Sequence, residues 1–380
     1  MQKVFDYLKG DRVIWAVVLL LAIFSVLVVY SSIVTLAYKY QDGNTEFYLF
    51  KHCIILLIGF LLMYGAHKVN YRYFSRISQI ALFIAVPLLF FTLLTGASIN
   101  DASRWLVIPI INQTFQTSDL AKLALIMFLA RMLSKKQDNI KDFNQAFVPI
   151  MIPVLIICGL ILPANFSTAA MLFMTCLVLM FIGRINMAYI ISLVSIGIVC
   201  LAIFIAVVMN SNYSSRVGTW QSRIENFSSG KSEANYQAEQ SKIAIASGGV
   251  FGKGPGRSTQ RNFLPQSYSD FIFATLIEEY GAIGGVFTLL LYLILFYRSI
   301  LIAKKAPRTF GALLAIGLSF SLVFQAMINM AVAVNLFPVT GQPLPMVSMG
   351  GTSIWFTCLA IGIILSVSRF SEEDKSLQHE

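Results

Sequence analysis

Charged residues are scarce in this chain of 380 residues. Asp, Glu, Lys and Arg together make up 12% of it, whereas 57% is hydrophobic. Water-soluble domains carry about 25% charged residues. The deficit therefore excludes an ordinary soluble domain and predicts an integral membrane protein, in which one membrane domain uses the whole length. The net charge of +10 does not indicate nucleic acid binding, because such an excess is typical of the cytoplasmic loops of membrane proteins.

Cysteine, histidine and nucleotide-binding motifs are equally sparse. The five cysteines lie in apolar runs, which is typical of small hydrophobic side chains and not of disulfides or metal ligands. His52, His67 and His379 are too scattered for a zinc site. The glycine-rich segment 248–258 resembles a phosphate loop, but its spacing fits neither G-x-x-x-x-G-K-[ST] nor G-x-G-x-x-G. If the chain is an enzyme, its energy must come from the substrate and not from ATP.

Long hydrophobic runs are what the sequence has instead. A membrane-spanning helix needs roughly 20 apolar residues. Ten runs are near this length or longer, the fourth of them being short, and they predict an all-α fold of ten transmembrane helices in one domain over residues 1–380. The runs are 13–36, 48–66, 80–97, 119–134, 146–163, 167–183, 187–209, 271–300, 311–334 and 350–369.

Basic residues in the short loops predict the orientation. Alternate loops are rich in Lys and Arg, which marks the cytoplasmic side: they include Lys3, Lys9, Arg12, Lys68, Arg72, Arg76, Lys135, Lys136, Lys141, Arg184, Lys304, Lys305 and Arg308. Both short tails, 1–12 and 371–380, should then be cytoplasmic. The large loop 210–270, between the seventh and eighth helices, should be extracytoplasmic.

Asp270 ends that loop and opens the eighth hydrophobic run. A carboxylate held where water meets lipid is costly unless it has a partner or a task. A catalytic base is one interpretation, and an N-cap for the following helix is the other. Glu278 and Glu279 lie deeper along the same predicted helix, and structural pairing is expected for them.

Four more polar clusters fall on the predicted outer side. In the first, Asp119 and Lys122 share a helix face and can pair, and Arg104 could bind a carboxylate or phosphate; the alternative is a helix start capped by Ser118. The second is the break between two hydrophobic runs around Asn165, and a tight turn is the favoured interpretation of it. The third is the basic loop, with Arg216, Arg223 and Lys253, which suits a pyrophosphate or is simply solvated.

The fourth of these clusters spans residues 335–353. Its three prolines and three glycines cannot form a regular helix. Irregular backbone at membrane depth is tolerated only inside protein or beside water, so this segment should shape a cavity. Its candidate binding residues are Gly341, Ser348, Gly350, Gly351 and Ser353.

Taken together, these motifs resemble the shape, elongation, division and sporulation (SEDS) family. The resemblance rests on 264–273 with Asp270, on 278–281, on 338–353, on 103–105 and on 116–122. The form of 338–353 is more similar to the division branch, FtsW, than to RodA. Two positions depart from the family pattern: Asp119 stands where a Glu is usual, and Asn165 stands where an acid is usual.

The resemblance implies a peptidoglycan glycosyltransferase that polymerises lipid II in the bacterial cytoplasmic membrane. For a member of the division branch, it implies a location at the septum. It implies a class B penicillin-binding transpeptidase and divisome proteins as partners. The family's essential loop aspartate corresponds to Asp270, and its Arg and Lys to Arg104 and Lys122. A divalent cation, Mg²⁺ or Mn²⁺, could assist, but no Asp/Glu cluster in the sequence specifies one. A lipid flippase and a scaffold for the transpeptidase remain the alternative functions.

Overall fold

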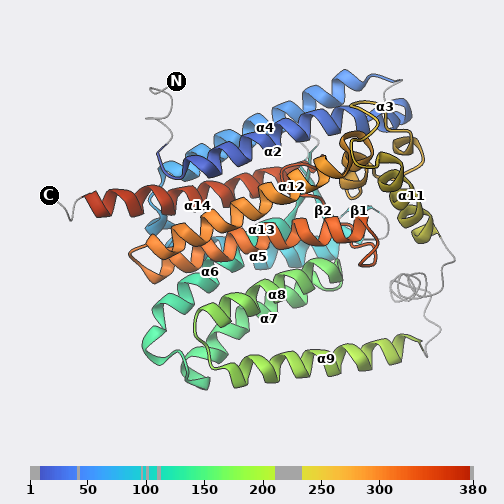
Figure 1. Cartoon of the computed structure of the whole chain (residues 1–380). Coiled ribbons are helices and arrows are strands. Elements are labelled where there is room, and N and C mark those ends of the chain that lie inside the picture. Colours follow the sequence, from blue (N-terminus) through green and yellow to red (C-terminus); the bar gives the residue numbers. More distant parts are fainter. Residues whose placement is uncertain are drawn as a thin grey trace.

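The computed structural model describes residues 9–40, 43–95, 97–99, 102–108, 113–209 and 233–376 (Figure 1). Its helices form a bundle, with a small sheet at one end. The helices are α2 (Arg12–Ser32), α3 (Val34–Tyr40), α4 (Thr45–Lys68), α5 (Tyr71–Thr95), α6 (Thr117–Lys135), α7 (Val148–Ile161), α8 (Phe166–Ile182), α9 (Met187–Met209), α11 (Glu233–Gly248), α12 (Ile272–Lys305), α13 (Thr309–Ala333) and α14 (Thr352–Ser376).

Each of the ten predicted runs lies mainly on one helix, although 13–36 extends from α2 into α3 and 80–97 extends beyond α5 to the first residue of β1. Among the described residues, seven segments are long and apolar enough to cross a membrane. They are Arg12–Ser32, Thr45–Lys68, Tyr71–Thr95, Phe143–Ile161, Ile272–Lys305, Thr309–Ala333 and Thr352–Ser371. The helices α8 and α9 are also apolar, but their described apolar segments are shorter, and α6 carries charged side chains in both its first and last turns.

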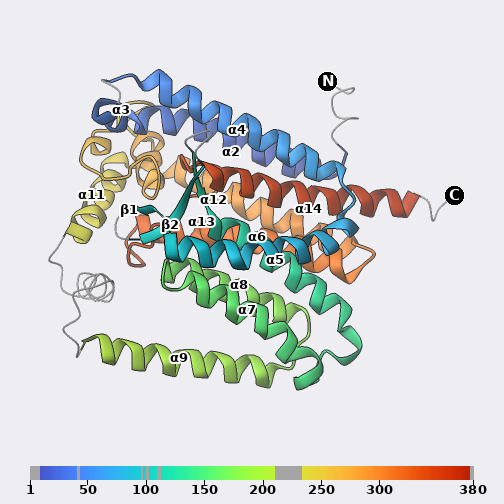
Figure 2. The same ribbon diagram turned by 180° about the vertical axis from the view of Figure 1, so that it is seen from behind.

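The bundle has two chemically different ends. The start of α2, the end of α14 and the connection from α12 to α13 lie together at one end, and α3, α11 and the sheet lie at the other (Figures 1 and 2). The helix α9 stands apart from the rest in both views. The first end carries the basic loops, and the second carries the polar clusters singled out in the sequence.

The helix α4 packs closely against α14. A Cβ on Gly59 would lie 2.8 Å from the Cys358 Sγ, and one on Gly362 would lie 2.4 Å from the Met63 carbonyl oxygen. Small residues allow this approach of two helix backbones, as is common in membrane proteins. Pairs of α12 with α13 and of α5 with α6 complete the core.

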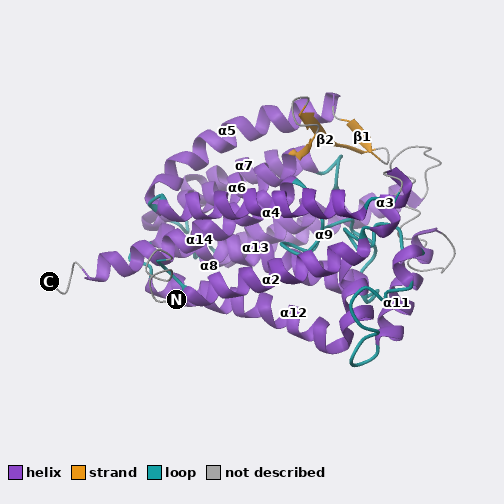
Figure 3. Ribbon diagram, turned by 90° about the horizontal axis from the view of Figure 1, so that it is seen from above, coloured by secondary structure: helices purple, strands orange, loops and turns teal. Residues whose placement is uncertain are grey.

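The all-α prediction was wrong in one respect, because a three-stranded antiparallel sheet lies between α5 and α6. Its strands are β1 (Ala97–Ile99), β2 (Ala102–Ile108) and β3 (Gln113–Gln116), in the order β1-β2-β3. Trp105 pairs with Gln116 across β2 and β3. Figure 3 shows the strands confined to one end of the bundle. Hydrophobic periodicity does not reveal them, because β1 and β3 have only three and four residues and β2 does not alternate apolar and polar residues.

Candidate active site

Asp270 lies at the end of the loop that leads into α12. Its side chain is half-buried, and its Oδ1 accepts a hydrogen bond of 3.0 Å from the Ser269 hydroxyl. The N-cap of α12 is Phe271, with no side-chain capping bond, so the N-cap interpretation of Asp270 was wrong.

The irregular segment between α13 and α14 packs against the Asp270 loop. The Ser348 hydroxyl donates a 2.6 Å hydrogen bond to the Ser269 carbonyl oxygen, and the Met349 amide donates one of 3.0 Å to the Tyr268 carbonyl. Gly341 has a φ of +65°, and a Cβ there would lie 3.6 Å from the Asp270 Oδ2. Two predicted site residues, Gly341 and Ser348, thus lie beside the carboxylate or its backbone.

Asn329 of α13 joins these two segments. Its Nδ2 donates to the Asp270 carbonyl oxygen at 2.8 Å and to the Gln342 carbonyl oxygen at 2.7 Å. Gln342 in turn donates to the Thr168 hydroxyl at 2.8 Å. Asn165 caps α8, because its side chain accepts from the Thr168 amide at 3.3 Å. The interpretation of this segment as a tight turn is confirmed, and hydrogen bonds through Gln342 and Asn329 connect the turn to the Asp270 backbone.

The pairing expected for α6 is present in the structure. The Lys122 Nζ lies 2.7 Å from the Asp119 Oδ1, and Asp119 is only 4% exposed. Lys122 also donates to the Gln325 Oε1 at 3.3 Å, and Gln325 donates to the Pro343 carbonyl at 2.9 Å. A cavity of about 40 Å³, lined partly by Asp119, Lys122, Gln325 and Ser353, lies here, and it has room for a few water molecules.

The helix start of α6 differs from the expected one. Its N-cap is Gln116, without a side-chain capping bond, and Ser118 lies inside the first turn, where its Oγ accepts from the Gln116 amide group at 2.9 Å. The Ser118 cap was therefore wrong. The Gln116 backbone N–H donates to the Thr352 hydroxyl of α14 at 3.3 Å, next to the predicted residues Gly350, Gly351 and Ser353.

Of the four remaining basic candidates, only Lys253 has a side chain that the structure describes. Arg104 lies on β2, but its side chain, like Arg216 and Arg223, lies outside the described residues. Lys253 forms an ion pair of 2.6 Å with Glu278, whose side chain is fully buried. The structural pairing expected for Glu278 is thereby confirmed.

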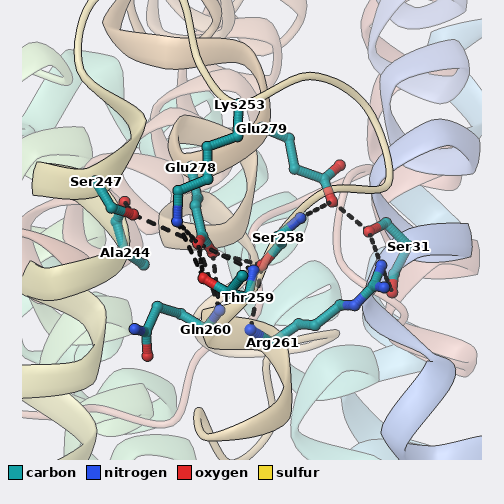
Figure 4. Close-up of polar contacts among 10 residues, drawn as sticks. All are labelled: Ser31, Ala244, Ser247, Lys253, Ser258, Thr259, Gln260, Arg261, Glu278 and Glu279. Atoms are coloured by element: carbon teal, nitrogen blue, oxygen red, sulfur yellow. Dashed lines mark hydrogen bonds and ion pairs between the residues drawn. The ribbon is translucent and has the colours of Figure 1, made fainter.

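Glu278 binds the loop that precedes Asp270 (Figure 4). Besides Lys253, its carboxylate accepts from the Ser258 hydroxyl, from the Thr259 amide at 3.1 Å and hydroxyl at 3.0 Å, and from the Gln260 amide at 3.3 Å. Charge-assisted bonds of this kind are the strong ones. The carboxylate therefore holds residues 253–260, here called the Glu278 loop, against the first turns of α12.

Glu279 connects the same loop to α2. It accepts from the hydroxyl of Ser31 and from the Ser258 amide at 3.3 Å. Arg261 donates to the Ser31 hydroxyl at 2.7 Å and to its carbonyl oxygen at 3.2 Å. The loop is thus bound on one side to α12 and on the other to α2.

Glycine makes the approach of this loop to α12 possible. A Cβ on Gly252 would lie 2.2 Å from the Glu279 carbonyl oxygen, and one on Gly281 would lie 2.1 Å from that of Val250. Gly281 also has a φ of 71° and a ψ of −176°, which break α12. Within the segment that resembles a phosphate loop, Gly248 and Gly252 therefore serve contact between two backbones.

Sequence reasoning missed the amides of α13. Gln325 and Asn329 are four residues apart, so they share one helix face, in an otherwise apolar helix. Polar side chains within a membrane helix are costly and mark functional positions. That spacing was the available signal, and the structure places both amides against the irregular segment.

Comparison with known proteins agrees with this architecture. Residues 11–373 match the family model FtsW/RodA/SpoVE, described as cell cycle protein. The chain belongs to the FtsW/RodA/SpoVE family. Its relatives include stage V sporulation protein E of Bacillus subtilis (strain 168), 34% identical over 95% of this chain and 97% of that protein. A probable peptidoglycan glycosyltransferase FtsW of Geobacter sp. (strain M18) is 34% identical over 94% of this chain and 96% of that protein.

Solved structures of the FtsW/RodA/SpoVE fold also superpose on the chain. The Thermus thermophilus rod shape determining protein RodA has a TM-score of 0.66 at 25% identity, covering 95% of this chain and 97% of that one. A chain from a peptidoglycan synthase complex has a TM-score of 0.75 at 24% identity, covering 96% and 99%. With its seven apolar segments, this member of the family is a multi-pass membrane protein.

Proposed function

We propose that this chain is a peptidoglycan glycosyltransferase that polymerises lipid II, with Asp270 as its general base. The observation that carries the proposal is the position of Asp270, a half-buried carboxylate at the end of a loop that hydrogen bonds join to the irregular segment between α13 and α14. Three relatives at 32–34% identity are named probable peptidoglycan glycosyltransferase FtsW, which supports the same activity.

In the proposed reaction, Asp270 accepts the proton of the 4-hydroxyl of an incoming lipid II. The oxygen then forms a bond to the anomeric carbon of the donor glycan, and the bond to the lipid pyrophosphate breaks with inversion. General base assistance contributes roughly 10²–10⁴ in rate. Cationic side chains stabilise the charge that develops on the leaving group, and Lys122, Arg104, Arg216 and Arg223 are the candidates.

The remaining polar candidates have supporting roles in this proposal. Asp119 orients Lys122, to which it is bound at 2.7 Å. Gly341, Gly350 and Gly351 keep side chains out of the substrate's path, and Ser348 and Ser353 border it. Among the described residues no three His, Cys, Asp or Glu side chains converge on one point, so no step is assigned to a Mg²⁺ or Mn²⁺ ion.

We place this activity at the outer face of the bacterial cytoplasmic membrane. The proposed topology has ten spanning helices, both termini in the cytoplasm and the loop 210–270 outside. It is supported by the separation of the ends of the bundle, because the connection from α12 to α13 lies at one end and the start of α12, which follows Asp270, lies at the other (Figure 1). The names of the relatives favour a role at the division septum.

A class B penicillin-binding transpeptidase is the proposed partner, together with divisome proteins. The support is the similarity of the fold to a chain from a complex described as coordinating polymerization and crosslinking. Joint action of a polymerase and a transpeptidase would cross-link each new glycan strand as it emerges.

The test compares wild type with Asp270→Asn in lipid II polymerisation, with the purified protein bound to a transpeptidase whose own active site is inactivated. Glycan length is read on a gel. Asp138→Asn, the same substitution at an exposed position, is the matched control. We expect polymer from wild type and Asp138→Asn, and none from Asp270→Asn in an intact complex. Polymer from all three would move the base elsewhere, and polymer from none would favour a flippase or a scaffold.

A further inference from the structure

A second cavity lies at the opposite end of the bundle from Asp270. It has a volume of about 360 Å³, within the usual range of ligand sites. Its walls come from the start of α2, the end of α12 and the last turns of α14. The polar lining residues are Asp11, Arg12, Arg298, Lys305, Ser368 and Ser371, and the name basic-end cavity is used for this site below.

The basic-end cavity has an excess of positive charge. Three cationic side chains and one carboxylate line it, a net charge of +2 (3 − 1). Asp11 is already committed, because its Oδ2 accepts from the Arg298 Nε at 2.9 Å and from its NH2 at 2.6 Å. Its Oδ1 accepts from the Val13 and Ile14 amides at 3.0 and 3.1 Å. Asp11 therefore orients Arg298 and caps α2.

The N-terminus of α2 adds to this field. A helix of 21 residues presents partial positive charge at its first turn, and that turn carries the lining residues Arg12 and Val13. The Asp11 side chain satisfies two of the free amides there. An anion in the cavity would therefore meet basic side chains from α2 and α12, beside a helix start that Asp11 already caps.

The cavity also has an apolar wall, which favours a lipid over a small soluble anion. Val13, Leu301 and Ile302 line it together with the basic residues. Exposed apolar side chains continue along the same two helices, among them Leu20 on α2 and Leu293 on α12. A headgroup in the cavity could thus keep its acyl chains on the outer surface of the bundle. Basic pockets between helices at the membrane surface bind anionic headgroups in this way.

We propose that the basic-end cavity binds the phosphate-containing headgroup of an anionic phospholipid. The cavity is separate from the proposed polymerase site. Its residues lie at the other end of the bundle, and none of them is among the residues described around Asp270. The bound lipid would tie α2, α12 and α14 together where they leave the membrane.

The experiment measures lipid retention by the purified full-length chain with native mass spectrometry, using phosphatidylglycerol and, for comparison, phosphatidylcholine. The test variant is Arg12→Gln/Lys305→Gln. The matched control is Lys304→Gln/Arg308→Gln, which removes the same charge at the same end from exposed positions that do not line the cavity. Arg12→Lys/Lys305→Arg keeps the charge and reports on damage to the fold.

Wild type should retain phosphatidylglycerol in preference to phosphatidylcholine. The test variant should lose roughly ten- to thirty-fold in apparent affinity, which is the effect of two basic side chains near an anionic surface. The matched control and the charge-keeping variant should stay near wild type, and Asp270→Asn should bind the lipid normally. Equal losses in test and control variants would overturn the proposal, because general surface charge would then explain the binding.

Two further measurements distinguish the lipid from other possible occupants of the cavity. Inorganic phosphate at millimolar concentration should not displace the lipid; displacement would show a site for a soluble anion instead. The acidic residues 372–374 follow Ser371 on α14. If they filled the cavity, wild type would show no lipid preference and Glu372→Gln/Glu373→Gln/Asp374→Asn would acquire one, which would also overturn the proposal.

Discussion

Glu278→Gln should release the Glu278 loop from α12. The carboxylate is fully buried and accepts from Lys253, Ser258, Thr259 and Gln260. A glutamine has the same shape, but it has one acceptor oxygen in place of two and it turns a donor toward a group of donors. Breaking a buried ion pair from one side costs about 3–5 kcal/mol. Because Lys253 is 31% exposed and can regain water, we take the lower limit, about 3 kcal/mol.

Hydrogen exchange of the loop amides measures this loss directly. The Thr259 and Gln260 amides donate to Glu278, so their protection reports the opening of the loop. A loss of about 3 kcal/mol corresponds to roughly 100-fold faster exchange. Glu239→Gln, the same substitution at an exposed position of α11, should leave these amides unchanged.

Polymerisation should fall together with protection in Glu278→Gln, because the same loop leads to Asp270. Lys253→Met should give a smaller effect, since the other donors to Glu278 remain. The reasoning would be refuted if peptides covering 253–262 exchanged in Glu278→Gln as in wild type. It would also be refuted if Glu239→Gln produced the same acceleration, because the effect would then come from charge alone.

Two further predictions concern backbone contact and the α6 ion pair. Gly281→Ala should abolish the folded protein in detergent, measured as loss of the monodisperse chromatographic peak, because its Cβ would lie 2.1 Å from the Val250 carbonyl oxygen; Gly65→Ala, with nothing within 4 Å, should behave as wild type. Lys122→Met should lower thermal stability and polymerisation, because it leaves Asp119 buried without its cation. Adding Asp119→Leu should restore the stability but not the activity, and an additive loss of stability would contradict the coupling of the pair.

The positions of the helices could be predicted from the sequence because hydrophobic runs act locally. In a bilayer every backbone polar group must be satisfied inside the segment, so a run of about 20 apolar residues has to be a helix. The sheet was missed for the complementary reason. Strands such as β1, with three residues, take their hydrogen bonds from neighbouring strands, and no short sequence pattern encodes them.

The candidate site divides in the same way. The ion pair of Asp119 with Lys122 follows from spacing within one helix, and both residues were correctly paired. The partners of Asp270 were not foreseen, since Asn329 lies 59 residues further along the chain. The glycines at 248–256 were compared with a phosphate loop, whereas Gly252 is required because another backbone approaches it.

The class of protein, the positions of the apolar helices and the junction at Asp270 follow from composition and from local runs of residues, and the family follows from motifs along the chain. Which polar groups meet depends on the tertiary structure. The Ser348 hydroxyl reaches the Ser269 carbonyl across 79 residues of sequence, and the basic-end cavity draws on α2, α12 and α14. Such contacts depend on how the helices pack against one another, and the pattern within any single helix does not contain that information.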